Sequence, residues 1–247
     1  MTGLLRRIGR LPFGAAAGIG LGARENPASP GLSRTGLRHL GIRDYLADRK
    51  IPHDAAMLDV GCGNAALARL LTESGYRSLS GCDWIAEAEV AWPNAGGTYR
   101  RVDLNAEGLA PFADDSFDVV ICSDVIEHLE NASLMLREIR RVLRPGGLAV
   151  VTLPNAFNLV ERLCWFLRGN STRYKAEQSL DEHGHITVVP SDVMRSLAAR
   201  AGLGIVHVQG GYGYFDGYVV RKKLGTGLSY NIMWVLEKPG GTEGAAR

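Results

Sequence analysis

The sequence Met57–Leu71, MLDVGCGNAALARLL, predicts a strand, a tight turn and a helix in direct succession. The apolar residues before Gly61 indicate a buried strand, Gly61 and Gly63 indicate the turn, and leucines at helical spacing indicate a helix from Ala65 onward. Such a corner directs backbone N–H groups and the positive end of a helix dipole to one point. Glycine there lets a ligand approach the backbone closely. We therefore expect the corner to bind a ligand with polar or anionic groups.

The composition is that of a single α/β domain. The chain has 247 residues, of which 46% are hydrophobic, enough to bury a substantial core. A formal net charge of +2 with 22% charged residues does not demand a nucleic-acid or anionic-membrane partner. The four cysteines are scattered and form no CxxC pair, which is typical of buried thiols in a reducing compartment. We therefore expect a cytoplasmic protein without a disulfide framework.

Residues 1–32 are expected to form a flexible leader. Three arginines in the first ten residues, followed by an alanine- and glycine-rich run, loosely imitate an export signal, but Pro12 and the glycines make that run a poor helix. We expect at most peripheral membrane contact, because no later segment approaches the ~18 apolar residues of a membrane span. The domain is expected over residues 33–237, followed by a flexible tail over 238–247.

The domain alternates apolar strands with helices, which is typical of a doubly wound parallel sheet. The alternation is interrupted at residues 154–190, an insertion of a length that is more often functional than idle. An apolar helix opens the insertion, and a polar segment with several histidines follows. The expected strands are 56–60, 79–82, 98–102, 117–122, 148–153, 205–209 and 230–237, the expected helices are 33–50, 65–71, 85–91, 132–143, 157–167 and 191–201, and residues 210–215 are expected to form a glycine- and tyrosine-rich loop.

Acidic side chains lie at the ends of several expected strands. Asp59 lies at the end of the first strand, and Asp83, Asp103 and Asp124 follow the next three. The carboxyl ends of parallel strands meet at the edge of the sheet where ligands bind. Asp83 comes 20 positions after Gly63, a spacing suited to binding two ribose hydroxyls, and Asp103 can reach a purine amine. Alternatively, these acids cap helices, and the glycine turn alone would also fit a dinucleotide.

Five strings, in this order and spacing, resemble the class I S-adenosylmethionine-dependent methyltransferases, in the large group that includes the ubiquinone-biosynthetic enzymes (type 11 methyltransferase domain). They are LDVGCGNA (58–65), CD (82–83), VDLN (102–105), PFADDSFDVVICSDVIEHL (111–129) and LREIRRVLRPGGLAVVTLPN (136–155). The resemblance implies a Rossmann-like, doubly wound sheet of seven strands, mostly parallel with an antiparallel last strand. It also implies S-adenosyl-L-methionine as the cofactor. One departure is Ala65, which stands where the family usually has a third glycine.

The resemblance implies a role for each matching position. Asp83 would bind the ribose hydroxyls, with Trp84 packing beside the adenine. Asp103 and Leu104 would hold the adenine, and the backbone carbonyl of Ser123 would lie near the sulfonium. From the methionine end to the adenine end, the implied cofactor-binding set is Asp59, Gly61, Gly63, Ser123, Asp83, Trp84, Asp103 and Leu104.

Three histidines are candidates for the general base that a hydroxyl acceptor would benefit from. They are His128, His183 and His185. His183 and His185 lie in the insertion, where enzymes of this kind often carry a histidine facing the active site, and we favour His185. His128 belongs to a string that is common in the family whatever the substrate, so it alternatively packs at a helix start.

Asp124, Glu127, His128 and His185 also loosely resemble the Mg²⁺- or Mn²⁺-binding set of the small-RNA 3′-end 2′-O-methyltransferases. The match departs from that group at Asp124, where those enzymes have glutamate, and their surrounding strings are missing. The basic surface that RNA binding needs is not evident at a net charge of +2. We therefore expect no metal and no nucleic-acid partner.

The expected reaction is methyl transfer to a small-molecule, glycan or lipid-linked acceptor, most readily on a hydroxyl oxygen. The helix over 158–167 is apolar on more than one side, so it either packs as a lid or meets a lipidic acceptor.

N- and C-methyl transfer are alternatives within the class. An NAD-dependent oxidoreductase and a non-catalytic cofactor-binding subunit are alternatives from other classes, and Asp59 in the turn argues against the first. The sequence indicates no oligomeric state.

Overall fold

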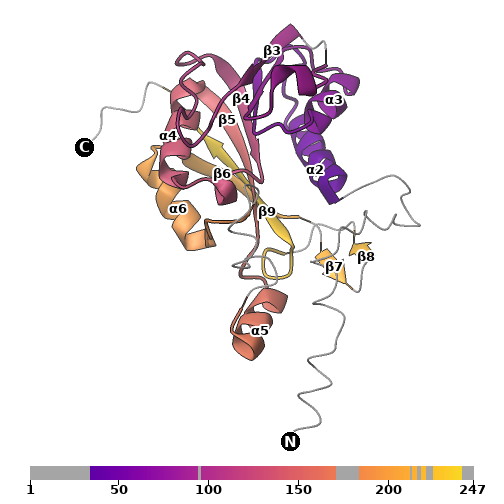
Figure 1. Ribbon diagram of the computed structural model, residues 1–247, viewed down its shortest axis with the longest axis vertical. Helices are drawn as coiled ribbons and strands as arrows, with labels where there is room; N and C mark the ends of the chain where they lie inside the picture. Colours follow the sequence, from indigo (N-terminus) through magenta and orange to yellow (C-terminus); the bar gives the residue numbers. More distant parts are fainter. Residues whose placement is uncertain are drawn as a thin grey trace, which may run out of the picture.

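A seven-stranded sheet in the order β3-β2-β1-β4-β5-β9-β6 forms the centre of the molecule (Figure 1). The computed structural model describes residues 34–93, 96–170, 184–211, 213–215, 218–220 and 225–240. β1 to β5 pair in parallel, and β9 is antiparallel to both β5 and β6. The predicted fold class is therefore confirmed. The strands are β1 Met57–Val60, β2 Leu79–Asp83, β3 Gly96–Arg101, β4 Phe117–Ser123, β5 Leu143–Pro154, β6 Gly204–Gly210 and β9 Asn231–Glu237.

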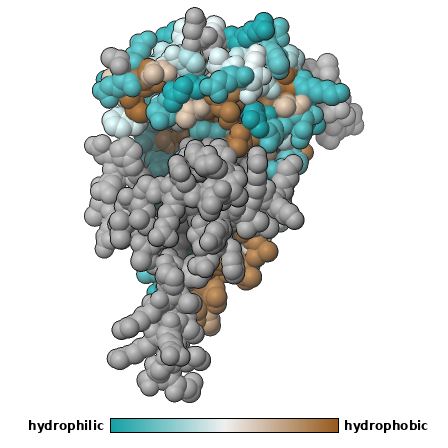
Figure 2. Space-filling model, turned by 90° about the vertical axis from the view of Figure 1, so that its right-hand side faces the viewer, coloured by the Kyte–Doolittle hydropathy of each residue, from teal (hydrophilic) through white to brown (hydrophobic). Residues whose placement is uncertain are grey.

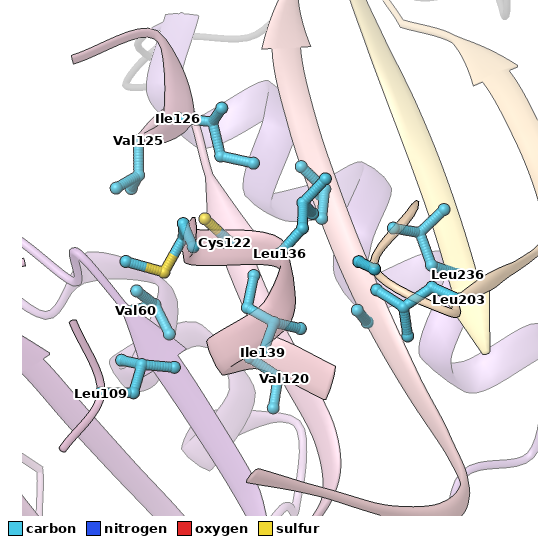
Figure 3. Packing of buried hydrophobic residues seen from close by; sticks show 14 of the residues in the cluster. Val60, Leu109, Val120, Cys122, Val125, Ile126, Leu136, Ile139, Leu203 and Leu236 are labelled. Carbon is cyan, nitrogen blue, oxygen red and sulfur yellow. The ribbon is translucent and has the colours of Figure 1, made fainter. Parts of the chain in front are cut away.

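Helices cover both faces of the sheet, as Figure 1 shows, with α2 and α3 on one side and α4 and α6 on the other. They are held there by alternating side chains of the strands, which point to opposite faces. In β4, Val120 and Cys122 pack in one apolar cluster with α4 residues such as Leu136 (Figure 3), while Val119 and Ile121 pack in the cluster under α2 and α3. The helices are α2 Arg34–Asp48, α3 Ala66–Glu73, α4 Ala132–Val142, α5 Leu159–Arg168 and α6 Ser191–Arg200, with 3-10 turns η2 Glu87–Glu89 and η3 Ile126–His128.

Residues 85–91 differ from the helix that was predicted for them. They contain only the single turn η2, and Val90 after it is extended. Val90 is buried, and the ring of Trp92 packs directly over Gly81 of β2, so the chain is drawn onto the sheet before a helix can develop. The prediction of a helix here was wrong because the packing of Val90 and Trp92 against the sheet overrides local propensity.

The glycine- and tyrosine-rich residues 210–215 also differ from the loop that was predicted. β6 extends to Gly210, and a two-stranded antiparallel hairpin follows, formed by β7 Gly213–Phe215 and β8 Tyr218–Val220. The pairing joins Tyr214 to Val219 in the register. Tyrosine and valine favour strands once a partner strand is available.

The helix α5 stands away from the two layers (Figure 1). The Asn158 side chain caps its first turn by accepting from the Glu161 amide at 2.9 Å, and Gly169 ends it in a left-handed conformation. Figure 2 shows apolar side chains gathered at the lower end of the molecule, where α5 lies. The large apolar side chains of α5 that are exposed are Leu159, Val160, Leu163, Trp165, Phe166 and Leu167. Among the described helices, none is long and apolar enough to span a membrane.

The predicted leader, residues 171–183 of the insertion and residues 241–247 lie outside the described part of the chain. At the C-terminal end of the described domain, the backbone of Lys238 pairs with Gly146 and Gly147, near the start of β5. Its carbonyl accepts from the Gly146 amide at 2.7 Å, and its own amide donates to Gly147 at 3.0 Å. The domain boundaries otherwise stay predictions.

The contact between Gly81 and Trp92 predicts a loss of stability in Gly81→Ala. A methyl group at Gly81 would overlap with the Trp92 ring, and overpacking of this kind costs about 1–3 kcal/mol. Urea unfolding should show this decrease in the free energy of unfolding. Gly225→Ala is the matched control, because a methyl group there meets no atom within 4 Å. Equal stability of the two variants would contradict the packing described for Trp92.

Candidate cofactor and acceptor site

The corner between β1 and α3 is held against the end of β2. The amides of Gly61 and Cys62 both donate to the carbonyl of Cys82, at 2.8 and 3.1 Å. Gly61, Gly63 and Ala65 all have left-handed φ angles, of 66°, 52° and 61°. This conformation costs an alanine about 1–2 kcal/mol, so the position where the family usually has a third glycine keeps a glycine-like backbone. The predicted strand, turn and helix are confirmed.

The two glycines of the corner serve different purposes. A side chain at Gly61 would overlap with Cγ2 of Val125, so this glycine is required by packing against the segment after β4. At Gly63 a side chain would meet no atom within 4 Å. Gly63 therefore borders open space, whereas Gly61 also makes room for Val125. The contacts of both glycines with a ligand stay predictions.

Two buried acidic side chains lie at the carboxyl ends of β1 and β2. Asp83 is 7% exposed, and its Oδ2 accepts from the Gly63 amide at 2.8 Å. Asp59 is 4% exposed, and its Oδ2 has no hydrogen-bond partner among the described residues. Burial, and secondly the charge of Asp83, raise the pKa of Asp59 to about 8. An acceptor of this kind favours a cationic or hydrogen-donating group on a ligand, because such a group would satisfy it.

The candidates for the adenine end lie on the next strands. Trp84 follows β2 and is 52% exposed. Asp103 follows β3, and its Oδ1 accepts from the amides of Asn105 and Ala106 at 2.9 and 3.2 Å, which is the capping role that the sequence left open. Leu104 is half-buried against the main core cluster. The geometry brings these residues to the same edge of the sheet as Asp83, and their contacts with a nucleoside stay predictions.

A polar network joins the end of β4 to α2. The Ser123 and Thr152 hydroxyls lie 3.0 Å apart, and Thr152 donates to Oδ1 of Asp124 at 2.6 Å. The guanidinium of Arg38 forms an ion pair with Asp124, which has a left-handed φ of 54°. Sequence reasoning missed Arg38 and Thr152, because only the fold brings residues from α2 and β5 to Asp124.

Two of the three candidate histidines meet beside this edge. The ring centroids of His128 and His185 are 4.8 Å apart, with an angle of 68° between the ring planes. The carboxylate of Glu127, which is fully buried, lies next to them, and ligand atoms of all three side chains are within 4.8 Å of one another. His183 lies outside the described residues. The sequence named both histidines, but their meeting depends on the return of the insertion to η3.

Comparison with known proteins gives a matching family model and a set of relatives. The model described as "Methyltransferase domain" matches residues 58–151. A probable S-adenosylmethionine-dependent methyltransferase of Mycolicibacterium smegmatis is 39% identical over 131 residues, which cover 51% of this chain and 49% of that protein. A ubiquinone biosynthesis O-methyltransferase of Sinorhizobium medicae is 26% identical over 186 residues, covering 74% and 73% of the two chains. The first of these matches thus spans about half of the relative's length.

Solved structures share the fold at low sequence identity. The magnesium protoporphyrin IX methyltransferase of Synechocystis, determined with bound SAH, aligns with a TM-score of 0.57 and 17% identity, covering 81% of this chain and 82% of that one. The [4+2]-cyclase SpnF aligns with a TM-score of 0.56 and 16% identity, covering 81% of each chain. Since these likenesses concern the fold alone, the function has to be argued from the site.

The raised pKa of Asp59 predicts a pH-dependent stability. The folded chain holds the proton on Asp59 up to about pH 8, whereas the ordinary pKa is 3.8. The folded state therefore binds more protons between these values, and the free energy of unfolding falls as the pH rises through this range. Asp59→Asn imitates the protonated side chain. Between pH 5 and pH 8, the wild type should lose on the order of a few kcal/mol relative to this variant in urea unfolding.

The exposed Asp54, which precedes β1 at the opposite edge of the sheet, supplies the control Asp54→Asn. This variant should follow the pH profile of the wild type. If Asp59→Asn follows it as well, Asp59 is ionised in the folded protein and the assigned environment is wrong.

Proposed function

We propose that this chain is a class I S-adenosylmethionine-dependent methyltransferase, which transfers a methyl group from that cofactor to a hydroxyl group of a small-molecule, glycan or lipid-linked acceptor. The observation that carries the proposal is the buried, unsatisfied Oδ2 of Asp59, on the strand that leads into the corner where Gly63 borders open space. S-adenosylmethionine carries an ammonium group and a sulfonium, and both favour a carboxylate. Its positive charge would favour the ionised form of Asp59, whereas a pyrophosphate would be repelled by the charge of Asp83, which argues against a dinucleotide.

The residues present fit the cofactor. Asp59 would accept from its amino group, the open space at Gly63 would admit its methionine end, and Asp83 would bind the ribose hydroxyls with the lone pairs that the Gly63 amide leaves available. Trp84 offers an exposed ring for the adenine. When bound, the cofactor supplies a methyl group on a positively charged sulfur that leaves as a neutral thioether. The protein therefore has to align the acceptor and exclude water.

The acceptor side is proposed to lie at His128 and His185. A hydroxyl acceptor must lose its proton, and we assign this activation to the histidine pair, with His185 as the residue that acts as general base. His185 is partly exposed, whereas Glu127 beneath it is buried, so His185 is on the accessible side of the cluster. The O-methyltransferase names of several relatives support an oxygen acceptor.

The exposed apolar residues of α5 support an acceptor with an apolar part. Phe166 is 85% exposed and Leu159 is 62% exposed, while Glu161 on the same helix is buried. A helix whose apolar side chains face outward offers contact area to a lipidic group. We therefore propose a lipid-linked or otherwise apolar acceptor ahead of a purely polar one.

A calorimetric titration with S-adenosylmethionine and, separately, with NADH tests the cofactor. We expect S-adenosylmethionine to bind, and Asp83→Ala to weaken this binding by roughly 10- to 100-fold, because two hydrogen bonds to a carboxylate are lost. Asp54→Ala, at the opposite edge of the sheet, should bind like the wild type. Binding of NADH without binding of S-adenosylmethionine would refute the proposed function, and unchanged affinity in Asp83→Ala would refute the ribose assignment.

A turnover assay tests the acceptor side. Cell extract is incubated with the enzyme and S-adenosylmethionine carrying a labelled methyl group, and methylated products are identified by mass spectrometry. On the product found, His185→Ala should lower kcat by roughly 10²- to 10⁴-fold and leave the affinity for S-adenosylmethionine unchanged. His53→Ala, which alters a histidine before β1, should remain fully active. Full activity of His185→Ala would show that His185 is not needed to activate the acceptor.

A further inference from the structure

Residues 184–187 are fixed against η3 by backbone contacts. The amides of Ile186 and Thr187 both donate to the carbonyl of Glu127 at 2.9 Å, and the Thr187 hydroxyl donates to the carbonyl of Leu129 at 2.6 Å. Two segments more than fifty residues apart in the chain are thereby locked in register. His185 consequently has a defined position over Glu127 and His128, as a preorganised site requires.

The side chains held in this way converge on one point. One ligand atom from each of Glu127, His128 and His185 lies within 4.8 Å of the other two. Ligands of a first-row metal ion lie about 2.0–2.2 Å from it, so they are separated by roughly 3–4.4 Å across the ion. The observed separations thus need only a small contraction to surround one ion.

His128 is oriented as metal-bound histidines are. Its Nδ1 lies 3.0 Å from the carbonyl of Gly184, and since a carbonyl can only accept, Nδ1 carries the proton. Nε2 therefore keeps its lone pair. A hydrogen bond from the second ring nitrogen to a backbone carbonyl fixes the tautomer and the ring direction of a ligating histidine.

The charge of the site suits a cation. Glu127 is fully buried, and a buried carboxylate favours positive charge nearby. Asp124, three residues earlier, is engaged by Arg38 and Thr152, so it is not part of the set.

We propose that Glu127, His128 and His185 form a binding site for a divalent transition-metal ion such as Zn²⁺ or Mn²⁺. Two imidazoles and one carboxylate suit such ions better than Mg²⁺ or Ca²⁺.

The site would also have room for the acceptor. Three protein ligands leave at least one coordination position open, and the two histidines are only partly buried. Resting on the proposed function, a hydroxyl bound at this position would become more acidic and lose its proton to solvent. Its oxygen would then form the new O–CH₃ bond as the S–CH₃ bond breaks and the neutral thioether leaves. In the metal-bound form His185 would act on the hydroxyl as a ligand of the ion, and in the metal-free form as the general base assigned above.

Metal binding is tested on the full chain without an affinity tag, after chelation and desalting. Titration with Zn²⁺ and with Mn²⁺ should show one bound ion per chain, and elemental analysis should give the same stoichiometry. Glu127→Gln and His185→Ala should weaken binding at least about 100-fold. His53→Ala, in the same chain but before β1, should bind like the wild type. Co²⁺ serves as a spectroscopic probe, because its visible absorption in the wild type should be lost in Glu127→Gln.

Titration with S-adenosylmethionine separates this proposal from the proposed function. All variants should still bind the cofactor, which also shows that they are folded, and His128→Gln takes the place of any variant that does not fold. If the wild type binds the cofactor but neither metal, or if Glu127→Gln and His185→Ala bind metal like the wild type, the metal site is refuted and the methyltransferase assignment stands. Turnover that is unchanged by chelation would refute the role in activating the hydroxyl.

Discussion

The close burial of two carboxylates, Asp59 and Asp83, is the constraint on which the site depends. Both lie at the carboxyl ends of neighbouring strands, and the charge of Asp83 adds to burial in raising the pKa of Asp59. The Gly63 amide stabilises Asp83, but the buried Oδ2 of Asp59 has no partner among the described residues. A fold keeps such a group only where something else compensates for it. A ligand with positive charge would do so, which is the basis for proposing that the corner binds the amino-acid end of a cofactor and not a phosphate.

The sheet topology is what brings this corner and the acceptor side together. β1 lies between β2 and β4, so the ends of these three strands form one edge, with Asp83 on one side of the corner and Asp124 on the other. Arg38 of α2 reaches across to Asp124, which ties the first helix of the described domain to that edge. The apolar clusters on both faces pack the strands against the helices.

The parts of the structure that depend on local patterns could be predicted from the sequence, and those that depend on distant partners could not. The continuous apolar run of β4 and the glycine corner identified the central strands and the fold. The short turn at 85–91 was missed, because the packing of Trp92 over Gly81 is not visible in local propensity. Likewise, the packing of Gly61 against Val125 depends on a distant partner and was not predicted, while the capping role of Asp103 was one of the two alternatives that the sequence left open. The histidine pair was named, but its geometry comes from hydrogen bonds between η3 and residues 184–187.

The five residues after β4 link the two halves of the site. Asp124, in a left-handed conformation, directs the chain so that Val125 packs against Gly61 of the cofactor corner. Two residues later, Glu127 and His128 lie next to His185, where the acceptor is proposed to bind. Because a single short turn contributes to both, a displacement of η3 would move the histidines and the Gly61 contact together. The order and spacing of the segment DVIEHL are therefore constrained from both sides: by the packing of Val125 against Gly61 and by the contact of Glu127 and His128 with His185.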